Sequence, residues 1–254
     1  MRIALLTDIH GNLEALEACL AHAAAQGAER LVFLGDLVGY GADPVAVVVR
    51  LRALMEPGAW GGTIAGAIAL RGNHDEAALR GPVGFSGLAA EAMRWTQAQL
   101  DAPTKAFLAE LPFTHAEEDR LYTHADASSP PAWRYVTNAT EARRSLAGTT
   151  QRLTFCGHTH VPALFGLTAT EKLLHHEPAS DIMLPLLQPR RWLAVIGAVG
   201  QPRDGNPAAC YGLLDTARAE CGWMRVPYDI EAAARKIRAA GLPEALAARL
   251  FDGR

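Results

Sequence analysis

The segment RIALLTDIHGN, residues 2–12, combines a short apolar run with polar residues that follow it immediately. The run ends at Asp8, and apolar residues at helical spacing continue from Leu13 to Leu20, with Asn12 as an N-cap and Gly27 as a stop. This pattern predicts a strand that enters a helix.

The same strand and helix pattern recurs along the first two thirds of the chain. Strands are predicted at Leu31–Leu34, Thr63–Leu70 and Arg152–Cys156, and a hairpin at Pro112–Glu117 with Arg120–Thr123. Helices are predicted from Asp43-Pro44 to Met55, across Leu88–Leu111 with a restart at Pro103, and across Ala139–Leu146 after an Asn138 cap.

The last third of the chain is mostly β in pattern and closes with two short helices. Its predicted strands are Ala163–Leu167, Leu173–His176, Trp192–Ile196, Cys210–Asp215 and Gly222–Val226, and its helices begin after Asp229 and near Pro243. Early helical crossovers and late adjacent strands predict an α/β (α+β) fold, a four-layer αββα sandwich of two mixed sheets. We expect one domain over residues 1–254.

Five of the predicted strands are followed directly by side chains that can bind metal ions. These are Asp8-Ile9-His10, Gly35-Asp36, Gly72-Asn73-His74-Asp75, His124 and Gly157-His158-Thr159-His160. Ligands in α/β folds gather outside the carboxyl ends of strands. Carboxylates, imidazoles and an amide without thiolates favour divalent manganese, iron, zinc or nickel. The sequence therefore predicts a metal site at the strand ends.

Each of these motifs occurs in many unrelated chains, whereas their joint order is informative. Side chains two residues apart on extended backbone point the same way, as in Asp8 with His10. Glycines at positions 35, 72 and 157 let the backbone turn sharply beside the ions. The remaining histidines, His22, His115, His175 and His176, are expected on the surface.

Together and in this order, the five motifs resemble the calcineurin-like metallophosphoesterase superfamily, in particular its small bacterial and archaeal phosphoesterases. The segments Gly200–Pro207 and Trp133–Val136 are also similar to that subgroup. One departure is Ala125, which stands where the family usually has glycine after the fourth-motif histidine.

The resemblance implies a site for two divalent ions, with manganese as the first expectation and iron, nickel or zinc as alternatives. It assigns one ion to Asp8, His10, Asp36 and His160, and the other to Asp36, Asn73, His124 and His158. His74 would face the substrate without binding metal, and Asp75 would orient the His74 ring.

Hydrolysis of a phosphodiester or phosphomonoester is the activity that this resemblance implies. A hydroxide that bridges the two ions would attack the phosphorus in line, and His74, with a pKa near neutral, would stabilise charge or protonate the leaving oxygen. Arg203 is a candidate for binding substrate phosphate, although its turn-rich loop also fits a structural role. Tyr40 is a candidate pocket residue or a cover for the second strand.

Two alternative functions remain open at this level. A nucleotide or dinucleoside polyphosphate hydrolase, or a protein phosphatase, belongs to a related branch that usually resembles GDxVDRG, whereas this chain reads Gly35-Asp36-Leu37-Val38-Gly39-Tyr40-Gly41. A non-catalytic interaction scaffold would be expected to lack ligands or the catalytic histidine, and here the whole set is present.

The composition excludes several partners and locations. A formal net charge of −3 without a lysine and arginine cluster argues against nucleic-acid binding. Apolar segments are interrupted by polar residues, so no membrane association is expected. Four cysteines without framework spacing, and no export signal, favour the cytoplasm. We expect a small phosphate ester as the partner, and a homo-oligomer is possible.

Overall fold

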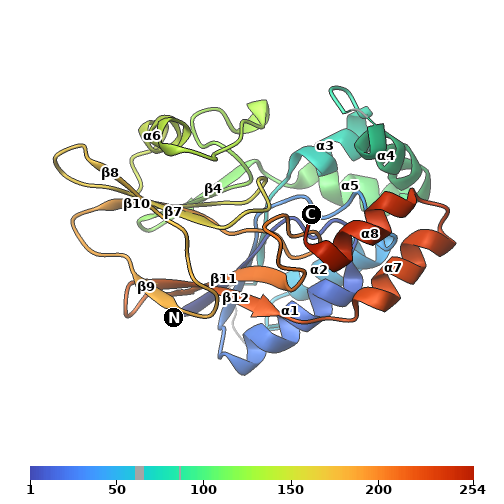
Figure 1. Ribbon diagram of the computed structural model, residues 1–254, viewed down its shortest axis with the longest axis horizontal. Coiled ribbons are helices and arrows are strands. Elements are labelled where there is room, and N and C mark those ends of the chain that lie inside the picture. The colour runs from blue at the N-terminus through green and yellow to red at the C-terminus, as the bar shows by residue number, and fades with distance from the viewer. Residues whose placement is uncertain (61–65, 86) are drawn as a thin grey trace.

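The strands of the computed structural model, which describes residues 1–60, 66–85 and 87–254, form two mixed six-stranded sheets packed face to face (Figure 1). Helices cover the outer faces of both sheets, so the predicted αββα sandwich is confirmed. Among the described residues, no helix is both long and apolar enough to cross a membrane.

The first sheet has the order β3-β2-β1-β11-β12-β9 and the second has the order β4-β5-β6-β10-β7-β8. The strands of the first sheet are β1 Arg2–Leu6, β2 Arg30–Phe33, β3 Ile68–Ala69, β9 Met183–Pro185, β11 Ala209–Asp215 and β12 Glu220–Val226. Those of the second are β4 Thr114–Glu117, β5 Arg120–Thr123, β6 Leu153–Cys156, β7 Ala163–Leu167, β8 Leu173–His176 and β10 Arg191–Val195.

Parallel pairing places several strand ends at the same edge of each sheet. In the first sheet β1 pairs in parallel with β2, and β2 with β3, whereas β11, β12 and β9 are antiparallel to their neighbours. In the second sheet β5 and β10 both pair in parallel with β6. The strands that precede the five metal-competent motifs are therefore the parallel ones.

Alternate side chains of β1 are buried in two different cores, one on each face of the sheet. Ile3 and Leu5 point into the core between the sheets, where they join Phe155 and Trp192 of the second sheet. Ala4 and Leu6 point the other way, into the core beneath the helices. Successive strand residues face opposite sides, so an apolar run of this kind needs a cover on each side.

The helices are α1 Leu13–Ala25, α2 Pro44–Met55, α3 Asn73–Arg80, α4 Gly87–Gln99, α5 Ala102–Glu110, α6 Ala139–Ala147, α7 Ile230–Ala239 and α8 Glu244–Asp252, with a 3₁₀ turn at Pro130–Ala132. Residues of α1 and α2 pack on the first sheet, and Ala142 and Leu146 of α6 pack on the second. The predicted caps Asn12 and Asn138 accept backbone N–H groups at the starts of α1 and α6.

Most predicted elements are present, with three differences. The third strand is shorter than predicted, because β3 covers only Ile68–Ala69, and residues 63–65 of that prediction lie outside the described residues. Strand β9 and helix α3 were not predicted at all. Helix α3 begins at Asn73 itself, so the third motif lies on a helical turn that follows the strand.

Candidate metal centre

Asp8, His10 and His160 form the first group of the site, and all three are buried. The Asp8 Oδ1 atom lies 3.2 Å from His160 Nε2 and 3.7 Å from His10 Nε2, and the two ring nitrogens lie 3.0 Å apart. The other carboxylate oxygen of Asp8 is already engaged, because it accepts hydrogen bonds from Thr7 Oγ1 and the His158 N–H. One oxygen of Asp8 is thus held in place and the other faces the histidines.

Asp36, Asn73, His124 and His158 form the second group, which touches the first through Asp36. The Asp36 Oδ2 atom lies 3.3 Å from His124 Nε2 and 3.7 Å from His10 Nε2. His124 Nε2 also lies 3.1 Å from Asn73 Oδ1 and 3.2 Å from His158 Nδ1. A single carboxylate oxygen therefore lies between the two groups, as the predicted bridging role of Asp36 requires.

Four histidines of the site are oriented by backbone carbonyl groups. The Nδ1 atoms of His10, His124 and His160 lie 3.2, 2.9 and 2.6 Å from carbonyl oxygens of Val38, Leu34 and Gln201, in that order. His158 is turned the other way, with Nε2 at 2.9 Å from the Trp133 carbonyl oxygen. A carbonyl oxygen can only accept a hydrogen bond, so that ring nitrogen is the donor and the other ring nitrogen faces the cluster.

The backbone of the ligand loops is strained. Asp8, His10, Asp36, His158 and His160 all have positive φ, between 51° and 69°. Side chains with a Cβ rarely adopt this left-handed conformation, which raises the energy by about 1 kcal/mol or more at each residue. Backbone hydrogen bonds from Asp8 to Gly35 and from His10 to Asp36 tie the loops together and hold these residues in place.

Two glycines let the loops approach the carboxylates closely. A Cβ at Gly72 would collide with the Asp36 carboxylate, and a Cβ at Gly157 would collide with Thr7 and the Asp8 carboxylate. Both positions therefore need a residue without a side chain, as expected from the sequence for close approach near the ions.

The pKa values of most candidate ligands favour the deprotonated form. Burial raises the pKa of Asp8 and Asp36, but the imidazoles of His160 and His124 beside them outweigh this and hold both pKa values below the usual range. Burial lowers the pKa of His158 and His160 to about 4, whereas the Asp36 carboxylate outweighs burial at His124 and raises its pKa to about 9. At neutral pH Asp8, Asp36, His158 and His160 are therefore deprotonated, which is the state that binds metal ions, and a cation would have to displace a proton from His124.

The residues present fit two divalent cations. Asp8 Oδ1 is buried and has no hydrogen-bond partner in the described part of the chain. The Nε2 atoms of His10 and His160 lie 3.0 Å apart, and the Nδ1 of each ring already faces a backbone carbonyl, so a cation near both Nε2 atoms would find two nitrogen donors. Carboxylate and imidazole donors suit manganese, iron, nickel or zinc. Their role as ligands stays a prediction.

His74 lies close enough to His10 and Asp36 to hold an ion with them, but among the described residues it lacks the carbonyl contact that orients the four candidate ligands. Its ring is 4.6 Å from the ring of His10, and its Nδ1 has no hydrogen-bond partner within the described residues. The backbone N–H of His74 donates to Asp36 Oδ1. Burial holds the pKa of His74 well below its usual value, whereas a pKa near neutral is expected from the sequence. The neutral imidazole is thus able to donate a hydrogen bond.

Among the described residues Asp75 makes no hydrogen bond to the His74 ring, which the sequence led us to expect it to orient. Its Oδ1 accepts the N–H groups of Leu37 and Val38, and its Oδ2 accepts the N–H of Gly72. Consecutive residues of a helix point in different directions, which separates Asp75 from the His74 ring. The carboxylate therefore positions the loop that carries Asp36.

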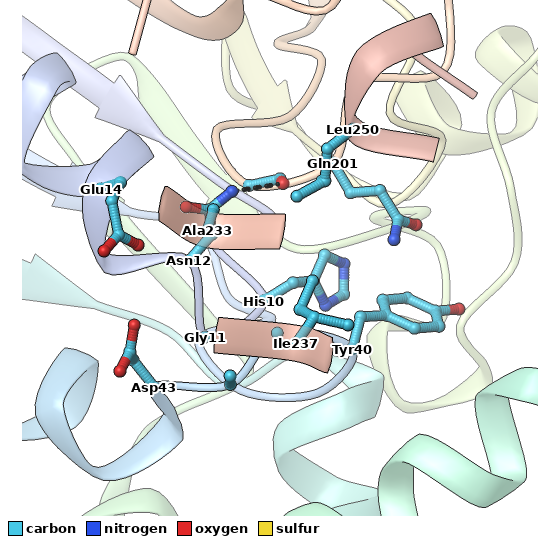
Figure 2. Close-up of a pocket in the computed structure, with 13 residues that line it drawn as sticks. His10, Gly11, Asn12, Glu14, Tyr40, Asp43, Gln201, Ala233, Ile237 and Leu250 are labelled. Carbon is cyan, nitrogen blue, oxygen red and sulfur yellow. Dashed lines mark hydrogen bonds between the residues drawn. The ribbon is translucent and has the colours of Figure 1, made fainter. Parts of the chain in front are cut away.

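Tyr40 and Arg203 both lie at the edge of the cluster. The Tyr40 ring is 4.8 Å from that of His10 and 4.6 Å from that of His74, and Figure 2 shows it beside His10 with Gln201 nearby. Arg203 Cζ lies 5.6 Å from the centre of the Tyr40 ring, and its backbone N–H donates to the His160 carbonyl. The dashed line in Figure 2 marks the bond from Asn12 Nδ2 to the Gly200 carbonyl, which fixes the start of the same loop.

Some contributors to the site were not found from the sequence. The carbonyls of Trp133 and Gln201 act through the backbone, and any residue type supplies a carbonyl. Tyr135 stacks on His158, with ring centres 4.2 Å apart and planes at 15°. Only its position in the Trp133–Val136 segment, which resembles the family subgroup, pointed to Tyr135 in the sequence.

Known proteins resemble this chain in sequence. A sequence model described as the calcineurin-like phosphoesterase superfamily domain matches residues 1–219. An uncharacterised protein of Methanocaldococcus jannaschii is 34% identical over 258 residues, which cover 99% of this chain and 98% of that protein.

Two solved structures resemble the whole chain. The crystal structure of a metallophosphoesterase from Sphaerobacter thermophilus is 34% identical and covers 100% of both chains, with a TM-score of 0.86. A hypothetical protein of Pyrococcus horikoshii is 17% identical, with a TM-score of 0.79, over 100% of this chain and 98% of that one. At that lower identity the similarity concerns the fold.

Proposed function

The chain belongs to the calcineurin-like phosphoesterase superfamily, and on that premise we propose that it hydrolyses a small phosphodiester or phosphomonoester at a pair of divalent ions. Asp8, His10, Asp36 and His160 would hold one ion, and Asp36, Asn73, His124 and His158 the other. Ions bound there would activate a water molecule and neutralise charge on the phosphoryl oxygens. Manganese is our first candidate.

The observation that carries this proposal is the position of Asp36 Oδ2 between two groups of oriented ligands. Each group has a carboxylate oxygen and histidine nitrogens that face inward. A set of this kind that shares one carboxylate is suited to two ions rather than one.

The other side chains of the site would bind and orient the substrate. His74, buried and neutral, would donate a hydrogen bond to a phosphoryl or leaving oxygen. Arg203 has no carboxylate partner among the described residues, so its guanidinium would attract a phosphate group. A net charge of −3 supports a small ester over a nucleic acid as the substrate, and we place the reaction in the cytoplasm.

Hydrolysis of chromogenic esters by metal-stripped protein tests the proposal. Bis(4-nitrophenyl) phosphate and 4-nitrophenyl phosphate would each be assayed after reconstitution with manganese, nickel, zinc or magnesium. We expect metal-dependent turnover with a preference between the esters. Asp36→Asn should lose turnover and bound metal together, because it changes the shared ligand, whereas Asp252→Asn, at an exposed position of α8, should behave as wild type.

The contrary result is protein that binds none of the ions and hydrolyses neither ester. That outcome would favour the non-catalytic scaffold over the enzyme.

A further inference from the structure

A large hollow opens next to the candidate metal centre. Its volume is about 740 Å³, and its wall comes from segments far apart in the sequence, including Tyr135, Thr159 and Val161, Arg203 and Arg225. Hollows of roughly 300–1,000 Å³ are the usual size of small-molecule sites. The volume therefore fits a substituent of a small ester.

Residues that adjoin the candidate ligands line the hollow. Thr159 lies in the chain between His158 and His160, and the backbone N–H of Arg203 donates to the His160 carbonyl at 3.2 Å. Tyr135 stacks directly on His158. A phosphate ester whose phosphoryl group lies at the ligands would thus have one substituent within reach of the hollow.

Two of the exposed large apolar side chains gather in this wall. Tyr135 is 50% exposed and Val161 is 42% exposed, and both line the hollow. One face of the Tyr135 ring packs nearly parallel to the His158 imidazole, which fixes its orientation. An oriented aromatic ring with half of its surface free offers a stacking face for a second planar ring.

Charge is distributed unevenly in the wall. Arg225 forms an ion pair with Asp204, so these two charges compensate each other, and Glu177 is the other acidic residue of the lining. Arg203, which adjoins His160, has no carboxylate partner in the described part of the chain. The Arg203 end, beside His160, therefore favours an anionic group, and the Tyr135 end, beside His158, favours an uncharged one.

We propose that this hollow binds a planar aromatic substituent of the phosphate ester, stacked on Tyr135, while Arg203 faces the phosphoryl group. The inference rests on the proposed function and adds the class of substrate: an aryl or nucleobase-bearing ester rather than a sugar or alkyl phosphate. Tyr135 is then a specificity residue, because it contacts the part of the substrate that does not react.

Phosphonates test the proposal because they bind without being hydrolysed. The probes are phenyl- and benzylphosphonate, with cyclohexyl- and methylphosphonate as non-planar and small controls, measured by equilibrium dialysis and as inhibitors of bis(4-nitrophenyl) phosphate hydrolysis. We expect wild-type protein to bind the aromatic probes about tenfold more tightly than the other two. Tyr135→Ala should remove this preference, and Tyr135→Phe should keep it.

Leu187→Ala provides a matched control, since Leu187 is 52% exposed but does not line the hollow. Metal content would be measured for every variant. If Tyr135→Ala weakened the binding of methyl- and phenylphosphonate equally, Tyr135 would only support His158, and the inference would be overturned. Ester hydrolysis without any preference for aromatic probes would also overturn it while leaving the proposed function intact. Absence of all hydrolysis and binding would instead refute the proposed function.

Discussion

His74 and Asp75 are adjacent in the chain but act on different parts of the site. The His74 ring packs against His10 and Tyr40 at the cluster, whereas the Asp75 carboxylate accepts three backbone N–H groups from two loops. Burial raises the pKa of Asp75 to about 7, with a further contribution from the charge of Asp36. The two residues should therefore give different phenotypes when substituted.

His74→Ala should lower turnover at least a hundredfold while metal content stays near that of wild type, because the ring contacts the cluster without a carbonyl-oriented nitrogen. Asp75→Asn should lower both metal content and the free energy of unfolding, the latter by about 2 kcal/mol. One of its oxygens becomes an amide group that cannot accept the backbone N–H it faces. Elemental analysis, steady-state kinetics and urea unfolding distinguish the two.

Asp101→Asn is the matched control for the second change. Asp101 caps helix α5 with one bond to the Thr104 N–H, and asparagine serves equally well as a cap. If Asp75→Asn instead reduced only turnover, with metal and stability unchanged, the carboxylate would act on His74 after all.

Single residues differ in how well the sequence predicts them. Asp8, Asp36, His124, His158 and the other candidate ligands could be named because each directly follows a recognisable strand or its turn. The direction of the Asp75 side chain could not be read in this way, because the helical turn at Asn73 was not apparent. The residue types also do not indicate that the Trp133 carbonyl orients His158, because every residue has a carbonyl.

Whole elements were predicted where an apolar pattern was long enough to be distinctive. Strand β9 has only three residues, Met183–Pro185, at the edge of its sheet, and its proline argues against a strand in the sequence. Helix α3 carries mostly polar residues and starts within the metal motif. Both elements depend on tertiary contacts rather than on local pattern, as β9 does on its pairing with β12.

An ion pair between strands β2 and β4 joins the two sheets. Glu117 of β4 accepts a hydrogen bond from Arg30 of β2 at 2.5 Å and another from the Tyr122 hydroxyl at 3.0 Å. Burial raises the pKa of Glu117, but the Tyr122 and Arg30 contacts outweigh it and lower the pKa below the ordinary 4.5. Because the folded state holds the proton less tightly, this stabilisation is present above pH 4.5 and is lost as the pH falls below it.

Glu117→Gln should therefore reduce the free energy of unfolding by about 2 kcal/mol at neutral pH, and the difference from wild type should shrink below pH 4.5. Urea unfolding across that pH range measures the effect. Glu110→Gln, at an exposed position on α5, is the control. A difference that stayed constant with pH would show that the charge of Glu117 does not contribute.

In the whole molecule, the candidate metal centre lies where the two sheets meet. The first sheet supplies Asp8, Asp36 and Asn73 from the ends of β1, β2 and β3, and the second supplies His124 and His158 after β5 and β6. The sandwich itself was predictable, since strand patterns and crossovers indicated it. The relative placement of the sheets was not, because it depends on side-chain packing such as that of Phe155 and Trp192.

Ions bound between the sheets should stabilise the fold as a whole. Manganese at about a hundred times its dissociation constant should raise the free energy of unfolding by about 2.7 kcal/mol, provided that the unfolded chain does not bind it. Thermal unfolding with and without a chelator measures this change. Asp36→Asn should show a much smaller shift, and a wild-type melting temperature insensitive to manganese would contradict a site between the sheets.

The glycines packed against the candidate ligand carboxylates also limit which substitutions the protein can accept during evolution. Any side chain at Gly72 or Gly157 would displace Asp36 or Asp8, so we expect single substitutions there to abolish the proposed reaction instead of altering it. The wall around Tyr135 and Val161 carries no such restriction, because both side chains are about half exposed. On the proposed function, substitutions in the wall would therefore change which substrates bind while the candidate metal ligands stay the same.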